Sequence, residues 1–585
     1  MKNIKLLTFI LWTILSISIF FGLNSAFEYS YYFIEQTRMF EWTTGFAAKT
    51  LLQPLGLSVY LADFMTQFYA KPYAGAFWST LLFIGISVGL KSLLKKQSVP
   101  LSYISICLLP GIPLLFLGES FYYNLECSIA MVITLGLCNL HIHIANDKIR
   151  LLSLLLGGWI SYYVAGAAFV AFLFIGLVYE LSVGTKMRRL SVIAVLLSAL
   201  PVVVRYYMGQ TGTALSTFTP GCYTNSSMPQ PAIYYAWALM LLVSVVFLVR
   251  RPSTKKMNKY AIAGSFFIQL FVVGYVADYC YKNIFNQKNY LVMKADYLMR
   301  NQQWDELLAQ NFPTNKNLLL AGFQNYALAQ KGILADKGFS FHQPGSRGLI
   351  LPFSNAVPIM TFYSDMYYAL GNIALAQRYA FEVLAQSRDM GNPRSLIRLI
   401  QTNLIYGAHE VADKYIQLLE NTLYYSEIAQ YYKKFLYKDD LIDADKELGA
   451  KRKDIAQLTG HLDKQCSPMD MLEILKSNPA NKTVFQYLSM LALFGNDLES
   501  LKSLADIYKP MNSSERLPVH VQEGLLAYFN GDEAAYANYN ISSNTIERFN
   551  VFMDLYSQSA NNPAAFNALK HKFKTTYWLY CLKTN

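Results

Sequence analysis

Apolar stretches of membrane-spanning length dominate the first half of the chain. A helix needs about 20 apolar residues to cross a bilayer, and about 17 is the short limit. A further apolar stretch, 151–184, is too long for one upright span and short for two. The sequence therefore predicts a polytopic helical bundle in this half. The other runs of this kind are 5–23, 74–94, 101–118, 122–144, 190–208, 232–249 and 260–279.

Composition and charge fit a chain that is only partly water-soluble. Hydrophobic residues make up 54% of the 585 residues and charged residues only 15%, whereas soluble globular proteins carry roughly 25% charged residues. Residues 1–285 contain 20 basic and 9 acidic side chains, and residues 286–585 contain 30 and 29. Almost all of the net charge of +12 therefore lies in the apolar half. We attribute it to membrane topology and expect no nucleic-acid partner.

The distribution of basic residues decides how the 151–184 stretch folds. Loops on the cytoplasmic side of a membrane carry an excess of Lys and Arg. If this stretch forms a hairpin that turns near residues 162–166, fifteen basic residues lie on the cytoplasmic side and four outside. With a single span the counts become eight and eleven. The sequence thus predicts about nine spans, a cytoplasmic N-terminus, and everything after about residue 281 on the outer face.

The first apolar run, 5–23, follows a short basic start, and Asn24-Ser25-Ala26 has the small residues of a signal-peptide cleavage site. The run is long and further spans follow it, so we expect an uncleaved anchor. The predicted domains are a membrane domain, 1–284, and an extracytoplasmic domain, 285–585.

Two predicted outer segments are too long to be simple connections. Segment 24–73 is rich in aromatic residues. Within it, 46–69 has the pattern of an amphipathic helix lying in the membrane interface, broken at Pro54-Leu55-Gly56. Segment 209–231 is rich in Gly and Pro and predicts an irregular loop. Long loops over a bundle often carry function.

The second half has short amphipathic helices separated by glycines at a regular interval. Gly371 and Gly407 are 36 residues apart, and so are Gly495 and Gly531. A helix pair every 34–36 residues is typical of a TPR-like (tetratricopeptide) α-solenoid. An irregular helical bundle is the alternative. The stretch 338–358 predicts a long loop inside the array. The predicted fold class is all-α: a polytopic transmembrane bundle followed by a TPR-like solenoid.

Sequence motifs for common chemistries are missing. The chain has no phosphate-binding loop, HExxH, GxSxG or strand-linked GxGxxG motif, so nucleotide hydrolysis, zinc proteolysis and hydrolase triads have no support. The seven cysteines form no CxxC pair and no zinc-spaced cluster with histidine. His141 and His143 are interpreted as interfacial residues at the end of a span.

The polar residues of the first outer segment are the best candidates for a site. Carboxylates at a membrane surface can deprotonate an acceptor hydroxyl or hold a divalent metal that bridges a lipid phosphate. Glu35 and Asp63 are the candidate catalytic acids. Arg38, Gln67 and Arg205 are candidates for binding a lipid phosphate or a substrate, and Glu119 and Glu126 are expected to border the same cavity. The alternative for each residue is an ordinary interfacial polar side chain or an ion-pair partner.

Both ends of the chain resemble one family. The resemblance rests on Tyr31-Tyr32-Phe33-Ile34-Glu35-Gln36, residues 55–69, Pro72, Gly75-Ala76 and Thr575-Thr576-Tyr577-Trp578-Leu579-Tyr580. These residues resemble an uncharacterised family of polytopic membrane proteins of Bacteroidota, known only as a domain of unknown function. The resemblance implies a bacterial inner-membrane location and no established activity. It also implies Pro-Gly-Gly where this chain has Pro54-Leu55-Gly56.

The layout is also similar to that of GT-C membrane glycosyltransferases, although their paired acidic motif is not plainly present. Three functions remain open. The favoured one is a scaffold, anchored in the bilayer, whose solenoid recruits envelope proteins in the periplasm. The second is a GT-C-like transferase that uses a polyprenyl-phosphate-linked donor. The third is a transporter or flippase, which the scarcity of ionisable residues within the spans disfavours.

Overall fold

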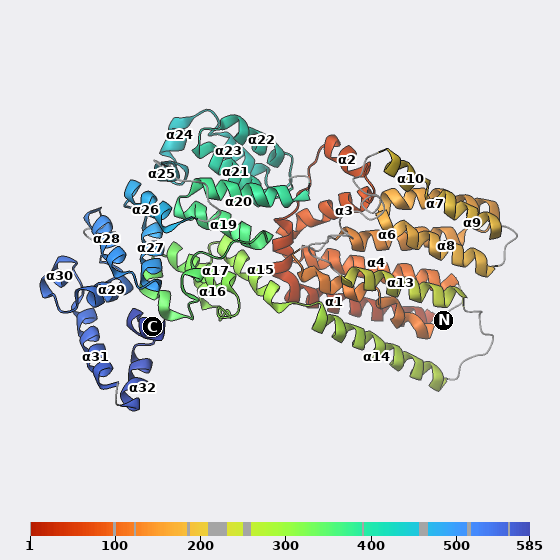
Figure 1. The fold of residues 1–585 in the computed structure, drawn as a ribbon. Coiled ribbons are helices and arrows are strands. Elements are labelled where there is room, and N and C mark those ends of the chain that lie inside the picture. Colours follow the sequence, from red (N-terminus) through yellow and green to blue (C-terminus); the bar gives the residue numbers. More distant parts are fainter. Residues whose placement is uncertain are drawn as a thin grey trace. The chain divides into compact units, whose positions relative to one another are not determined.

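The protein is helical throughout the part that the structure describes. The computed structural model describes residues 2–96, 101–121, 125–183, 188–208, 231–249, 259–388, 391–455, 466–511, 516–559 and 562–584, and contains no strand among them (Figure 1). The chain divides into two compact units. Unit 1 comprises Met1–Tyr290 with Asn421–Tyr424, and unit 2 comprises Leu291–Glu420 with Tyr425–Asn585.

Unit 1 is a bundle of long apolar helices joined by short ones. The long helix α4 packs against both α1 and α6. Gly85 and Gly89 on α4 permit the close approach, because a Cβ at Gly89 would lie 3.1 Å from Leu135 of α6. Small residues spaced by four are a common device for bringing membrane helices together. The helices are α1 (Lys2–Glu35), α2 (Thr44–Leu51), α3 (Gly56–Thr66), α4 (Ala74–Lys96), α5 (Gly111–Phe116), α6 (Glu126–His143), α7 (Asp147–Ala165), α8 (Phe169–Val183), α9 (Arg188–Leu197), α10 (Leu200–Tyr207), α13 (Pro231–Val249) and α14 (Lys259–Asn283).

Four helical segments of the described chain, rather than the nine spans predicted, are long and apolar enough to cross a membrane. They are Ala74–Leu94, Glu126–His143, Asp147–Ser182, which comprises α7 and α8, and Arg188–Tyr207, which comprises α9 and α10. The count of nine is therefore corrected. The predicted span 101–118 forms two 3-10 helices and the short α5 instead. Pro110 and Pro113 lie inside it, and proline removes a backbone donor and interrupts a long helix.

The 151–184 stretch is a hairpin, as the charge distribution predicted. Helix α7 ends at Ala165, a 3-10 turn follows at Gly166–Ala168, and α8 runs back along α7. Arg150 pairs with Glu180. A Cβ at Gly176 would lie 2.7 Å from Leu154. The two residue numbers in each pair have the same sum, as expected for two antiparallel helices packed in one register.

The predicted break in the first outer segment lies between α2 and α3. Leu55 adopts the left-handed conformation there, with φ of 67°. This conformation costs an L-residue roughly 1–2 kcal/mol. The Leu55 side chain is only 1% exposed, and burial of a leucine contributes roughly 1.5–3 kcal/mol. Burial therefore explains why leucine is tolerated at a position where the family resemblance implies glycine.

Unit 2 consists of short helices, and each neighbouring pair from α19 to α23 packs together. Between Gly338 and Ala356 the structure has only short 3-10 turns, so the predicted loop is confirmed. The helices are α15 (Gln287–Arg300), which crosses the unit boundary, α16 (Trp304–Ala309), α17 (Leu318–Gln330), α18 (Leu334–Lys337), α19 (Val357–Leu370), α20 (Ile373–Gln386), α21 (Pro393–Ile405), α22 (His409–Glu420), α23 (Ser426–Lys433), α24 (Asp439–Ala444), α25 (Leu448–Asp454), α26 (Pro468–Ser477), α27 (Lys482–Phe494), α28 (Leu498–Tyr508), α29 (Val519–Phe529), α30 (Glu533–Asn538), α31 (Ser543–Ser559), α32 (Pro563–Lys572) and α33 (Tyr577–Thr584).

All four periodic glycines lie at junctions between helices, as predicted. Gly371, Gly407 and Gly531 have positive φ, which glycine adopts without steric cost. At the fourth junction Gly495 is right-handed, and the left-handed residue is Asn496, with φ of 53°. The helices that follow begin with side-chain caps in several places, for example Asn372, whose oxygen accepts from the backbone N–H of Leu375.

We predict that Gly56→Ala destabilises unit 1. A Cβ at Gly56 would lie 2.3 Å from the Thr50 carbonyl oxygen, so the turn between α2 and α3 has to shift. Such overpacking costs about 1–3 kcal/mol, and it should lower the thermal unfolding temperature of the detergent-solubilised protein. Gly45→Ala is the matched control, since a Cβ there meets nothing within 4 Å. Equal unfolding temperatures for the two variants would contradict this account.

Candidate functional site

Arg38 lies between two buried carboxylates that come from distant parts of unit 1. Its Nη1 is 3.0 Å from Oδ1 of Asp63, and its Nη2 is 2.9 Å from Oε2 of Glu126. The Asp63 and Glu126 side chains are 8% and 2% exposed. We call Arg38, Asp63 and Glu126 the arginine triad. It connects the segment after α1, helix α3 and the start of α6.

The local sequence explains how the triad is assembled. Glu126 is the first residue of α6, where the positive end of the helix dipole favours an acidic side chain. Asp63 lies on the buried face of α3, together with Val59 and Ala62, and α3 packs against α6. Packing of the apolar face of α3 therefore brings Asp63 to the same place as Glu126.

The triad holds Arg38 firmly in its charged form. Burial opposes the charge of the guanidinium, but the carboxylates of Glu126 and Asp63 outweigh this effect and raise the Arg38 pKa. A buried arginine with two carboxylate partners is typical of a structural ion-pair network. In this arrangement both Nη atoms contact protein carboxylates instead of a ligand phosphate.

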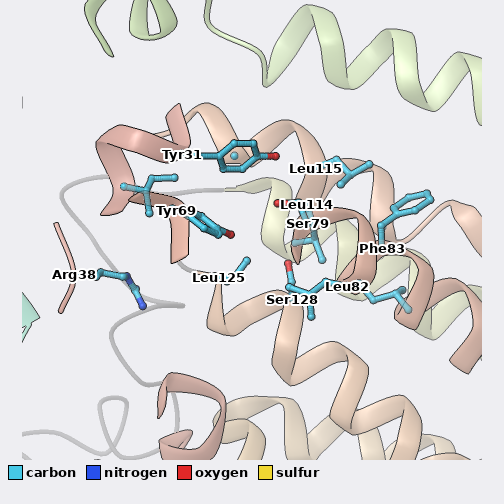
Figure 2. A pocket seen from close by; sticks show the side chains of 14 residues that line it. Tyr31, Arg38, Tyr69, Ser79, Leu82, Phe83, Leu114, Leu115, Leu125 and Ser128 are labelled. Atoms are coloured by element: carbon cyan, nitrogen blue, oxygen red, sulfur yellow. The ribbon is translucent and has the colours of Figure 1, made fainter. Parts of the chain in front are cut away.

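A small cavity adjoins Arg38 (Figure 2). Its volume is about 30 Å³, which is room for roughly two water molecules. Figure 2 shows hydroxyl groups of Tyr31, Tyr69 and Ser79 on its wall, and the two tyrosines hydrogen-bond to Ser79. A sugar or a lipid phosphate does not fit in this volume. The remaining lining residues are Ile34, Leu82, Phe83, Ile86, Gly111, Leu114, Leu115, Gly118, Leu125 and Ser128.

Glu35 and Gln67 are close in sequence to residues of the triad, and both are buried. Neither residue lines this cavity. Glu35 is the last residue of α1, and its carboxylate accepts a hydrogen bond from the Gln36 amide. The Gln67 amide donates to the Phe64 carbonyl at 2.9 Å. The other Gln67 side-chain atom, Oε1, has no hydrogen-bond partner among the described residues. The catalytic role of Glu35 stays a prediction.

Arg205 lies elsewhere, on α10, and its side chain contacts the turn between α2 and α3. Its Nη2 donates to the Gln53 side chain. The structure therefore brings together Arg38, Asp63 and Glu126, and it does not bring Arg205 into the arginine triad. The side chain of Glu119 and the loop 209–230 lie outside the described residues.

Within the described part of the chain, no group of three or more His, Cys, Asp or Glu side chains is placed to hold a metal ion. The triad offers two carboxylates, and both contact Arg38. The divalent metal considered for a transferase therefore has no ligand set there.

Sequence reasoning missed a second buried ion cluster, formed where α6, α7 and α8 meet. The Arg150 guanidinium pairs with Glu180 on α8 and with Asp147 at 2.8 Å, and it donates to the Ile144 carbonyl at 3.2 Å. His141 joins from α6, with Nε2 3.6 Å from Glu180. The antiparallel hairpin register was the available signal, because it places residue 150 opposite residue 180.

Comparison with known proteins gives a family without an assigned activity. The family model described as "Family of unknown function (DUF6057)" matches residues 2–584. The chain belongs to this family. No curated protein and no solved structure gives a significant match. The resemblance to an uncharacterised family is thereby confirmed.

We predict that Arg38→Gln destabilises this DUF6057 protein more than the loss of one hydrogen-bonding group explains. The substitution leaves two buried carboxylates without a counter-charge, which costs about 3–5 kcal/mol. The triple variant Arg38→Gln/Asp63→Asn/Glu126→Gln removes all three charges and should recover much of the loss. Thermal unfolding in detergent measures both effects.

Arg205→Gln serves as the control, because this arginine contacts a carboxamide and should change the unfolding temperature little. If Arg38→Gln unfolds at the wild-type temperature, or if the triple variant is less stable than the single one, the triad is not an ion-pair lock.

Proposed function

We propose that this DUF6057 protein is a membrane-anchored scaffold whose unit 2 binds a segment of a partner protein in the cell envelope. A groove of about 490 Å³ in unit 2 carries the proposal. It lies on α20, α21 and α22, and its lining is mostly apolar. The lining residues are Ala374, Gln377, Arg378, Phe381, Leu399, Asn403, Tyr406, Val411 and Tyr415.

The groove has the chemistry of a peptide-binding surface. Phe381, Tyr406 and Val411 are large apolar side chains that are 51%, 44% and 43% exposed. Aromatic anchors in a pocket supply most of the energy of typical protein interfaces. The carboxamides of Gln377 and Asn403 can pair with the backbone of an extended segment. The partner we propose is therefore a polypeptide segment with apolar side chains.

A buried ion network fixes α21, one of the three helices that form the groove. On α19, Asp365 contacts Arg394 and Arg398 of α21, the latter at 2.9 Å. Burial opposes the charge of Asp365, but both arginines outweigh it and lower the Asp365 pKa. Arg394 also contacts Asp296 of α15 at 2.8 Å. A groove held in shape before binding loses less entropy when a partner docks.

The same proposal includes a TPR-like solenoid in unit 2 and a defined membrane topology. The 36-residue interval between the helix junctions supports a TPR-like solenoid. The predicted topology would place its groove in the periplasm, with the N-terminus in the cytoplasm and unit 1 in the inner membrane. Solenoid surfaces are used mainly for binding other macromolecules.

A GT-C-like transferase is the second candidate. It is supported by the convergence of Arg38 and Asp63 from the first outer segment with Glu126 at one end of the bundle. The cavity volume of about 30 Å³ and the engagement of both triad carboxylates with Arg38 favour the scaffold. A transferase would need the triad to open before a polyprenyl-phosphate-linked donor could bind.

We predict that a photoreactive p-benzoylphenylalanine at Phe381 cross-links to a defined partner protein in cells. The matched control is Tyr528 on α29, which is 41% exposed and does not line the groove. Adding Tyr406→Asp and Val411→Asp should reduce the Phe381 adduct roughly tenfold or more, because charged groups in the groove disrupt an apolar anchor. The unfolding temperature of that variant checks its fold. The scaffold proposal would be wrong if Phe381 and Tyr528 gave identical adducts, or if the groove substitutions left the Phe381 adduct unchanged.

The transferase has its own test. A deletion strain is complemented with wild-type protein, Glu35→Gln or the control Glu28→Gln, and envelope glycans and glycolipids are profiled. A transferase predicts that Glu35→Gln, present at normal membrane levels, reproduces the glycan change of the deletion while Glu28→Gln restores the wild-type profile. The scaffold predicts full rescue by both variants. An unchanged profile in the deletion strain itself eliminates the transferase.

A further inference from the structure

An exposed apolar patch surrounds Arg205 at one end of unit 1. Leu51 and Leu52 close helix α2, and Tyr206, Tyr207 and Met208 close helix α10; all five are exposed, with Leu52 at 72% and Tyr207 at 81%. The hydrogen bond between Arg205 and Gln53 joins the two groups. Figure 1 shows α2 and α10 next to each other at this end of the bundle. We call these five residues the interfacial patch.

The patch continues the surface of a candidate membrane span. Residues Arg188–Tyr207, on α9 and α10, are apolar over a length that crosses a bilayer, and only 17% of their most apolar window is buried inside the protein. Tyrosines concentrate where spans leave the hydrocarbon region. The lipid surface that would cover α9 and α10 therefore extends over the patch.

Arg205 differs from Arg38 and Arg150, the arginines of the two ion clusters in unit 1. Arg38 and Arg150 each contact two carboxylates. Among the described residues, Arg205 forms no ion pair, and its Nε is buried without a hydrogen-bond partner. The loop 209–230 that follows contains no acidic residue. A guanidinium without a carboxylate at the membrane surface is suited to a phosphate.

We propose that Arg205 binds the phosphate of an anionic membrane lipid, and that the acyl chains of this lipid lie against the interfacial patch. The proposal does not depend on the function of the unit 2 groove. It moves lipid recognition from the arginine triad, where carboxylates occupy the guanidinium, to the turn between α2 and α3. Such a contact would fix the depth of the bundle in the bilayer.

The test uses the full chain in vesicles of phosphatidylcholine, with or without phosphatidylglycerol. A p-benzoylphenylalanine at Leu52 or Tyr207 should form lipid adducts detected by mass. The control position is Met469 on α26 of unit 2, which is 65% exposed and should form none. Arg205→Gln should lower the phosphatidylglycerol adduct at Leu52 about fivefold, the effect of one basic side chain near an anionic surface. Arg205→Lys should retain most of it, and added inorganic phosphate should leave it unchanged.

Three results would overturn the proposal. Adducts to a second copy of the chain, in place of lipid, would assign the patch to an oligomer interface. A phosphatidylglycerol adduct that Arg205→Gln does not change would remove the phosphate contact. Competition by inorganic phosphate would point to a site for a free anion. The unfolding temperature of Arg205→Gln separates a lost contact from a lost fold.

Discussion

Charged side chains are stable inside an apolar helical bundle only where opposite charges meet, and this constraint organises unit 1. Two arginines carry it. Arg38 joins the N-terminal end of α6 to α3, and Arg150 joins the C-terminal end of α6 to α7 and α8. Helix α6 is therefore held by a guanidinium at both ends, through the Glu126 carboxylate at its start and the Ile144 carbonyl at its end. Because an unpaired buried charge costs several kcal/mol, the neighbouring helices have little freedom to repack without breaking one of the clusters.

The same pairing of opposite charges occurs in unit 2, where it involves a helix that also lines the groove. Asp365 is shared by Arg394 and Arg398, and Arg394 is shared by Asp296 and Asp365. These contacts connect α15, α19 and α21, and α21 also contributes to the mostly apolar groove. If the helices of the groove were mobile, its exposed aromatic side chains could pack against one another and close it.

Local rules predicted much of the fold, and long-range pairing set the limit. The α7–α8 hairpin followed from the distribution of Lys and Arg, and the helix junctions followed from the periodic glycines, because both signals can be read from the sequence without knowing which helices pack together. The 101–118 stretch was misread because its mean apolarity hides the effect of Pro110 and Pro113 on a helix. For the site, Glu126 was expected to border the same cavity as the other candidates; the structure pairs it and Asp63 with Arg38, and neither lines the cavity beside that arginine. The partner of Arg205 was not, because Gln53 reaches it only after α2, α3 and α10 have packed.

The cavity of unit 1 and the groove of unit 2 differ in size and in the polar groups that they offer to a ligand. In unit 1 the cavity beside Arg38 holds about 30 Å³, and in unit 2 the groove holds about 490 Å³. The polar groups of the first are already satisfied by one another: tyrosine by serine, and guanidinium by carboxylate. The second presents carboxamides and exposed rings. Binding requires polar and apolar groups that gain interactions when a ligand arrives. The groove of unit 2 has more such groups than the cavity of unit 1. In the scaffold that we propose, the triad stabilises the bundle of unit 1 and the groove of unit 2 is the binding surface.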